Sequence, residues 1–356
     1  MSKIIYYIGA GASYGNKNKR ELLDEGTEDE RLLVHEGLPV VKEIAKSLVA
    51  FQEAVRNVDI IASKNYAFMD NRYYTNGTDV NYTRSQLLED IKELYKAANE
   101  HSTIDTYAKK LYLTKQVRQL KKLKNVLAAF FIWIQLESKT DQRYDTFLAN
   151  ILQMDNLSLP LNISVISWNY DSQFELAYKN YSNYNLPIYD KLGENSMPNN
   201  QDCGLIFKLN GSANFGDFNM VDYILNHREK DVHPLIQLIE YFGHLEADTK
   251  ELGFDFHSHL SFAWESTVRQ KEMITTINQI TSDTDAVVVI GYSFPYFNRE
   301  IDRAIFSKIP SLKTIYIQDP NPESVEPSLR AVLDENTNVK IEYQKDCTQF
   351  YLPREL

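Results

Sequence analysis

Short apolar runs and longer amphipathic runs occupy different parts of this chain. The short runs are rich in Val and Ile and predict buried β-strands at Ile4 to Ile8, Ile163 to Ser167, Leu205 to Lys208, Ala286 to Ile290, Thr314 to Ile317 and Val339 to Glu342. The longer runs place apolar residues every three or four positions and predict helices at Leu87 to Asn99, Ile104 to Leu113, Gln116 to Leu136 and Tyr144 to Met154. Together these runs predict an α/β protein.

The order of the elements predicts how the chain is divided. Residues 1–49 and 156–356 are expected to form a doubly wound, mostly parallel, Rossmann-like sheet with helices between its strands. Residues 50–155 are expected to form a helical insertion after the first strand, turn and helix. The acidic stretch Glu21 to Glu30 and the polar stretch Gly193 to Gln201 are expected to be surface loops.

The charge balance argues against a general attraction to nucleic acid. Lys and Arg together number 38 and Asp and Glu 49, which gives a net charge of −11. The longest apolar run, Val126 to Ile134, has nine residues and is too short to span a membrane as a helix. The N-terminus shows no signal peptide. We therefore expect a cytoplasmic protein without membrane contact or direct nucleic-acid binding.

The cysteines and histidines do not suggest a metal site. Cys203 and Cys347 are the only cysteines, too few for a disulfide framework or a four-cysteine zinc site. His257 and His259 flank Ser258, but no third ligand follows at a useful spacing, so we interpret them as loop or surface residues. We predict no bound metal.

Small and polar residues follow five of the predicted strands. The five segments are Gly9-Ala10-Gly11-Ala12-Ser13, Ser167-Trp168-Asn169-Tyr170-Asp171, Lys208-Leu209-Asn210-Gly211-Ser212, Gly291-Tyr292-Ser293-Phe294 and Asp319-Pro320-Asn321-Pro322. In an open parallel sheet the carboxyl ends of the strands face the ligand crevice, so these segments are expected to converge. Each alone has a simpler explanation, since glycines make tight turns and Asp171 suits an Asx-type cap at the start of a helix.

The first four segments, in this order, resemble the sirtuin superfamily. More narrowly, they are similar to its bacterial antiphage branch, whose members hydrolyse NAD when infection is sensed. Ile104-Asp105-Thr106 at a helix start and Phe262-Ala263-Trp264-Glu265 before the fourth motif support the resemblance, which covers most of the chain. The resemblance implies an NAD glycohydrolase that releases nicotinamide and ADP-ribose and depletes NAD in abortive infection.

Two departures from the family pattern bear on the activity. Protein-deacylating sirtuins carry a four-cysteine zinc module, which this chain cannot build, so deacylation is disfavoured. Asn210 stands where the family has its catalytic histidine, and an asparagine side chain cannot take up a proton near neutral pH. The alternative function is therefore a catalytically weak or inactive module that binds NAD or ADP-ribose.

The resemblance also assigns roles to individual residues. Asn169, Asn210 and Asp171 are the expected catalytic residues, with Asn169 placing a ribose hydroxyl or the attacking water. The expected NAD-binding residues are Gly9, Ala10, Gly11, Ala12 and Ser13 around the pyrophosphate, Ser293, Asp319 and Asn321 near the adenosine, and Asp105, Ser167, Ser212 and Gly291. NAD is the substrate in this hypothesis.

The helical insertion is the expected docking site for a partner. By resemblance to two-gene defence systems, the partner would be an ATPase or a nucleic-acid-sensing protein, and a homo-oligomer is also expected. Seven cations lie between Lys109 and Lys124 without an acid, and Phe130 to Trp133 form an apolar cluster. The simpler interpretations are a solvated helix face for the first and helix core for the second.

Overall fold

A sheet of seven parallel strands forms the centre of one part of the protein. In this computed structural model the strand order is β11-β10-β9-β1-β4-β6-β5. The strands are β1 (Ile4–Ile8), β4 (Ile163–Ser167), β5 (Ile188–Asp190), β6 (Ile206–Lys208), β9 (Ala286–Ile290), β10 (Thr314–Gln318) and β11 (Lys340–Gln344). Every neighbouring pair is parallel. The predicted sheet is confirmed, and only the short strand β5 lacked a signal in the sequence.

The structure describes residues 2–15, 35–60, 80–155, 157–182, 188–190, 203–215, 219–226, 232–246, 258–334 and 338–356. The chain divides into two compact units. Unit 1 comprises residues 1–38, 138–212 and 261–356, and unit 2 comprises residues 39–137 and 213–260. The predicted loops at Glu21 to Glu30 and Gly193 to Gln201, and His257, lie outside the described residues.

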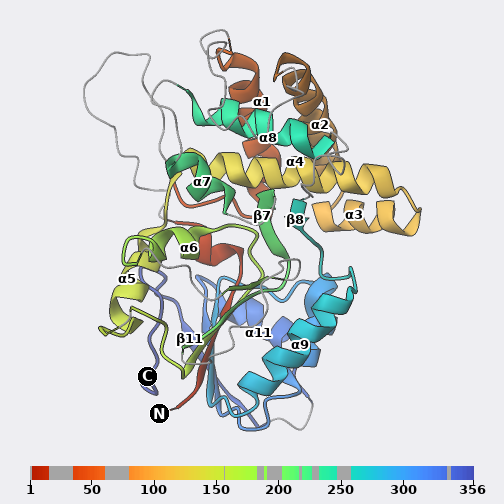
Figure 1. Ribbon diagram of the computed structural model, residues 1–356. Helices are drawn as coiled ribbons and strands as arrows, with labels where there is room; N and C mark the ends of the chain where they lie inside the picture. The colour runs from red at the N-terminus through yellow and green to blue at the C-terminus, as the bar shows by residue number, and fades with distance from the viewer. Residues whose placement is uncertain are drawn as a thin grey trace. The chain divides into compact units, whose positions relative to one another are not determined.

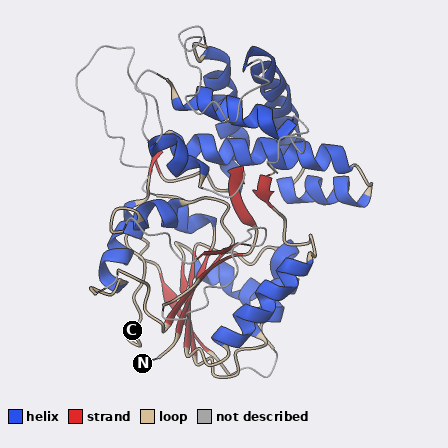
Figure 2. Ribbon diagram, viewed as in Figure 1, coloured by secondary structure: helices blue, strands red, loops and turns tan. Residues whose placement is uncertain are grey.

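Helices cover both faces of the sheet in unit 1 (Figures 1 and 2). Ile5 and Tyr7 of β1 point into one apolar layer, and Ile4, Tyr6 and Ile8 point into the other, because successive strand residues face opposite sides. The first layer includes residues from α9 (Val268–Thr281), α10 (Arg299–Phe306) and α11 (Pro322–Arg330), and the second includes residues from α5 (Gln142–Ile151) and α6 (Gln173–Tyr178). This arrangement is the predicted doubly wound, Rossmann-like fold.

Unit 1 also contains several short elements. They are the 3₁₀ turns η1 (Ala10–Ser13) and η5 (Tyr296–Asn298), and the short parallel pair β2 (His35–Glu36) and β3 (Ser138–Lys139). η1 begins two residues after β1 ends, and α10 follows η5 directly. The first sequence motif therefore lies mostly in η1, and the fourth lies in the loop between β9 and η5.

Unit 2 is mainly helical. It contains η2 (Val41–Glu43), α1 (Ile44–Asn57), α2 (Val80–Glu100), α3 (Ile104–Leu113), α4 (Val117–Leu136), α7 (Met220–Asn226), α8 (Pro234–Glu246) and β8 (Ser258–Leu260), and β7 (Gly211–Phe215) continues into it from unit 1. Thr103 caps α3 by accepting a hydrogen bond from the Thr106 amide at 3.1 Å. The predicted helices at Ile104 to Leu113 and Gln116 to Leu136 are present within one residue. The prediction that His259 is a loop or surface residue is wrong, because His259 lies in β8 and is buried.

The boundaries of the two units differ from the predicted domains. The helix α5 belongs to the sheet unit, because Phe147 packs edge-on against Tyr6 of β1 and Tyr144 packs against Phe174 of α6. Residues 213–260, expected in the sheet domain, belong to unit 2, where α8 contacts α2 and α4. Amphipathic spacing identified these helices but did not show which core they join.

The apolar cluster Phe130 to Trp133 belongs to the core of unit 2. Phe130 is fully buried and Trp133 is 5 % exposed, and both rings pack against Phe51 of α1. The proposed use of this cluster as a docking surface is therefore wrong, since a partner cannot reach it. The cationic segment differs: Lys110, Lys115, Arg118 and Lys121 are exposed. Within the described ranges, no helix is both long enough and apolar enough to cross a membrane.

Candidate functional site

The candidate site lies at the carboxyl ends of β1, β4 and β9. The chain builds the sheet outward from β1 through β4 on one side, then returns to place β9 on the other side of β1. This reversal is a topological switch point, where loops diverge and a ligand crevice is expected. The first, second and fourth sequence motifs all follow strands at this point.

The glycines of the first motif have a structural explanation. The amides of Gly9 and Gly11 donate to the carbonyl oxygens of Ile290 and Gly291 at 3.0 and 2.9 Å. A Cβ on Gly11 would lie 2.7 Å from the Cα of Gly291, and Gly291 itself has a φ of +57°. Glycine is thus needed because the β1 and β9 loops touch. Since both amides are used within the protein, other groups of the loop, such as exposed Ala10, would have to meet a pyrophosphate.

A hydrogen bond joins the first and second motifs. The side-chain Nδ2 of Asn169 donates to the Ser13 hydroxyl at 3.2 Å, and the Ser13 hydroxyl lies 2.9 Å from the hydroxyl of Tyr144 on α5. The amide of Asn169 donates to the Ser167 hydroxyl at 3.1 Å, which closes the turn after β4. Asn169 is 7 % exposed, so its side chain is held in one place by neighbours on both sides.

Asp171 both caps a helix and belongs to a buried charged group. Its carboxylate accepts from the Gln173 amide at 3.0 Å, which is the Asx-type arrangement suggested by the sequence. Burial raises the pKa of Asp171, and the nearby ammonium of Lys208 and the hydrogen bonds from Gln173 and Ser13 oppose that rise only in part. Asp171 therefore has two kinds of contact. Its carboxylate accepts from the Gln173 amide at the start of α6, and it also interacts with Lys208 and Ser13 of the candidate site.

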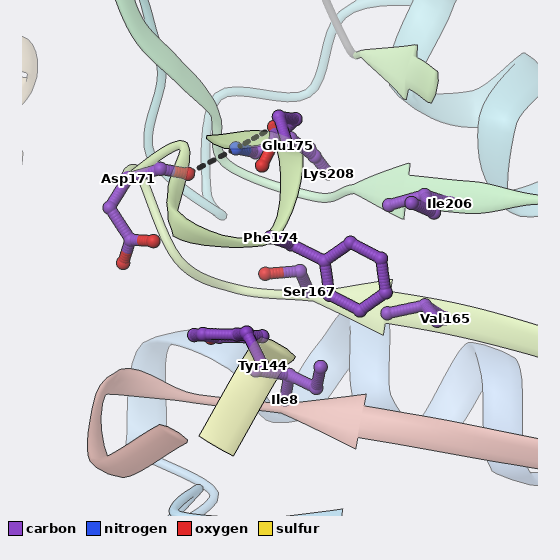
Figure 3. A pocket seen from close by; sticks show the side chains of 9 residues that line it. All are labelled: Ile8, Tyr144, Val165, Ser167, Asp171, Phe174, Glu175, Ile206 and Lys208. Atoms are coloured by element: carbon purple, nitrogen blue, oxygen red, sulfur yellow. Dashed lines mark hydrogen bonds and ion pairs between the residues drawn. The ribbon is translucent and has the colours of Figure 1, made fainter. Parts of the chain in front are cut away.

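Lys208 connects the second and third motifs. Its ammonium donates to the backbone oxygen of Asp171 and forms an ion pair with Glu175 of α6 at 2.7 Å (Figure 3). The Lys208 side chain is 3 % exposed and that of Glu175 14 % exposed. A buried charge of this kind is tolerated because its partner and hydrogen bonds replace its lost hydration.

A small pocket lies beside this ion pair. Its lining includes Tyr144, Ser167, Asp171 and Phe174, and Figure 3 shows Phe174 and Ser167 beside one another above Tyr144. The pocket has about 10 Å³ of room, roughly what one water molecule needs. It cannot hold a dinucleotide, so the NAD-sized crevice stays a prediction.

Asn210 carries an unpartnered polar atom. Its Nδ2 donates to the backbone oxygen of Trp168 at 3.2 Å, directly before Asn169 in the chain. Its Oδ1 is buried and has no hydrogen-bond partner among the residues that the structure describes, and the same is true of the hydroxyl of Ser261. The Ser261 amide donates to the backbone oxygen of Asn210 at 2.8 Å. Buried polar atoms are normally satisfied, so these two are candidates for contact with a ligand.

Three other predicted residues differ in their surroundings from the buried side chains described above. Ser293 and Asn321 are exposed, and the Asp319 carboxylate accepts from the Asn321 amide at 2.8 Å at the start of α11. That contact closes an Asx turn directly before α11 and needs no ligand. Their proposed place near an adenosine stays a prediction.

Two other predicted residues, Ser212 and Asp105, lie in β7 and α3. Ser212 is buried in β7 and is the last residue of the 138–212 segment of unit 1. Asp105 lies in unit 2, in the first turn of α3, and so does not belong to the group of side chains that unit 1 brings together. Asp105 therefore stays a prediction from the family resemblance.

Residues at the start of α5 contact the first motif, a contribution that was not predicted from the sequence. Arg143 forms a salt bridge with Asp141 at 2.6 Å and donates to the backbone oxygens of Gly11 and Ala12 at 3.2 and 3.0 Å. Asp141 also accepts from the Gly15 amide at 3.0 Å. These contacts fix the backbone of the first motif in place. The polar start of the helix was the available signal, but its apolar spacing led to its assignment to the insertion.

No family model and no curated protein sequence matches this chain. The fold and the side chains gathered at the switch point are therefore the structural basis for inferring a function.

Proposed function

We propose that this chain is an NAD glycohydrolase that binds NAD at the carboxyl edge of the sheet and releases nicotinamide and ADP-ribose. In the cell it would act as the NAD-depleting effector of a bacterial antiphage system. The order of the strand-end motifs supports the choice of NAD. The observation that carries the proposal is the hydrogen bond between Asn169 and Ser13, because it brings together the two loops that the resemblance assigns to the reacting ribose and the pyrophosphate.

The proposed reaction needs placement more than proton transfer. The bond between the ribose C1′ and the nicotinamide nitrogen breaks, its electron pair stays with the nitrogen, and neutral nicotinamide leaves without being protonated. A water oxygen forms the new bond to C1′, and its proton passes to solvent. Positive charge develops at the ribose in the transition state, so an oriented polar side chain near that centre accelerates the step.

Asn169 is the proposed residue for this placement. Its Nδ2 is engaged with Ser13, which leaves its carbonyl oxygen as the acceptor for a ribose hydroxyl or a water molecule. The buried Oδ1 of Asn210 offers a second acceptor on the neighbouring loop. Neither group takes up a proton at neutral pH, which is consistent with a reaction whose leaving group needs none.

A second candidate function is binding of NAD or ADP-ribose without turnover. Asn210 at the position of the family histidine favours it, since the side chain can hydrogen-bond a ribose but cannot act as a base. The two functions predict the same site and differ only in whether nicotinamide is released.

Incubation of the purified chain with NAD, followed by chromatography of nicotinamide and ADP-ribose, tests the proposal. The assay is run with and without the product of the neighbouring gene. Release of both products in equal amounts supports the glycohydrolase. Saturable NAD binding measured by calorimetry, without release of nicotinamide, supports the binding module. If the chain neither binds NAD nor releases nicotinamide, both proposed functions are ruled out.

Regulation by a partner is part of the proposal, because uncontrolled hydrolysis of NAD would kill the host. An ATPase or nucleic-acid-sensing protein is the proposed partner, and a homo-oligomer is the proposed assembly. The exposed cations of α3 and α4 are the remaining candidate contact surface in unit 2. Light scattering after size-exclusion chromatography, with an NAD assay on each species, tests this dependence on assembly. Full activity of an isolated monomer would contradict the proposed regulation.

A further inference from the structure

A buried carboxylate in unit 1 accepts hydrogen bonds from three aromatic side chains. Asp302 of α10 is fully buried, and its Oδ1 accepts from the hydroxyl of Tyr7 at 2.5 Å and from the indole nitrogen of Trp168 at 3.2 Å. Its Oδ2 accepts from the hydroxyl of Tyr292 at 2.9 Å. Tyr292 in turn accepts from Asn298 at 3.0 Å. Every oxygen of the carboxylate is therefore used.

The three donors come from β1 and from the loops after β4 and β9. Tyr7 lies in β1, two residues before Gly9. Trp168 directly precedes Asn169, and Tyr292 directly follows Gly291. The Trp168 and Tyr292 rings also stack, with centroids 5.9 Å apart and an interplanar angle of 7°. The Asp302 side chain thus connects β1 with the loops after β4 and β9.

Burial of a carboxylate at this position has an unfavourable desolvation free energy. Burial raises the pKa of Asp302 to about 7, opposed by the hydrogen bonds from Tyr7, Tyr292 and Trp168 and by the charge of Arg299. Those are the titratable and charged groups that face it from β1, the β9 loop and α10. An apolar side chain of similar size would fill the same space without this desolvation cost, although it would leave the three donors unpaired.

We propose that Asp302 is a positioning residue for the NAD site, whose carboxylate holds the Trp168–Asn169 segment in register with the loops after β1 and β9. This proposal rests on the proposed function, since it concerns the placement of Asn169. Asp302 touches no reacting atom in it. The ionised carboxylate is an acceptor only and suits three donors, whereas a protonated carboxyl group offers a hydrogen where an acceptor is needed.

The test compares Asp302→Asn with Glu300→Gln, which removes an exposed carboxylate from the same helix. In the first variant the amide hydrogens face donors, so one hydroxyl proton loses its acceptor and the Asn169 loop shifts. We expect a fall of about 10²-fold in kcat with little change in KM, because misplacement of the reacting geometry by about 1 Å has this effect. Wild-type kcat is expected to rise with pH through about 7, and Asp302→Asn is expected to lose that rise.

Tyr292→Phe keeps the test decisive if Asp302→Asn does not fold. It removes one donor and keeps the ring that stacks on Trp168, so a smaller fall in kcat in the same direction is expected. Unchanged kcat and an unchanged pH profile in each of these variants that folds would overturn the proposal.

Tryptophan fluorescence in the absence of NAD separates this proposal from the proposed function. Because the Trp168 indole donates to Asp302, the wild-type emission is expected to change with pH near 7, a change kept in Glu300→Gln and absent in Asp302→Asn. If this pattern is found but no nicotinamide is released, the arrangement of the loops stands and the proposed function fails. If the wild type shows no such change, the positioning role is overturned whatever the activity.

Discussion

Asn169 donates a hydrogen bond to the hydroxyl of Ser13 across 3.2 Å, although 156 positions separate the two residues in the chain. The contact forms because β1 and β4 are parallel neighbours in register, with Ile8 opposite Ser167 at their carboxyl ends. Each residue then follows its strand into the same edge of the sheet. Their contact joins two loops that have no local reason to meet.

Replacement of Asn169 by alanine is expected to lower nicotinamide release by about 10²- to 10³-fold, because an oriented polar contact at a developing charge is lost. The fold should remain, since β4 and its partners are unchanged. Asn150→Ala on the exposed face of α5 is the matched control. Product chromatography with circular dichroism measures both properties, and wild-type turnover in Asn169→Ala would contradict the assigned role.

Replacement of Asn210 by histidine is expected to raise turnover if proton uptake limits the reaction. The imidazole would supply a base with a pKa near neutrality at the position where the family has one. Asn180→His, at an exposed position in unit 1, controls for a general effect of an added histidine. Steady-state rates across pH 6 to 8 measure the effect. Equal rates in the two variants would show that the missing base is not limiting.

Breaking the buried ion pair is expected to destabilise unit 1. Lys208→Met leaves the Glu175 carboxylate without its partner, and loss of one member of a buried pair typically costs about 3–5 kcal/mol. The double variant Lys208→Met with Glu175→Leu should recover much of that loss. Lys313→Met, which removes an exposed lysine paired with Asp285, should have little effect. Urea denaturation checks all three, and equal midpoints for Lys208→Met and Lys313→Met would contradict the argument.

Replacement of Asp302 is expected to change how stability depends on pH. Because the folded-state pKa of about 7 exceeds the ordinary value of 3.8, the folded protein holds a proton between these values that the unfolded chain releases. This contribution to wild-type stability is present below about pH 4 and is lost as pH rises to about 7. The free energy of unfolding of Asp302→Asn relative to wild type should therefore increase over that range. Denaturation at several pH values measures it; a constant difference would contradict the assigned burial.

Replacement of Gly291 by alanine is expected to disrupt the contact between the β1 and β9 loops. The φ of +57° is unfavourable for alanine, and the new Cβ would lie 2.4 Å from the Cα of Gly11. Strain in the backbone alone costs about 1–3 kcal/mol. Ser293→Ala, two positions further on and exposed, should change stability by no more than about 0.5 kcal/mol. Thermal denaturation of the two variants compares them directly.

Local sequence patterns predicted six of the seven strands of the sheet, their parallel arrangement and the polar segments at their ends. Strand and helix periodicities are local properties, so β1, β9 and α3 could be read from a few neighbouring residues. The convergence of Ser13 and Asn169 also followed, because parallel strands end at the same edge. The short strand β5 was missed because three residues carry too little pattern.

Contacts between residues far apart in the chain determine which core each helix joins and which buried groups hold the loops. Amphipathic spacing is the same for α5 and α4, and their membership of different units depends on rings far away in the chain, Tyr6 for one and Phe51 for the other. Asp302 lies beside Ile301 in a short helix, where an acidic residue ordinarily faces solvent. Its burial depends on donors from β1 and from the segments after β4 and β9, and the long-range contacts with Tyr7 and Trp168 leave no periodic signal in the sequence.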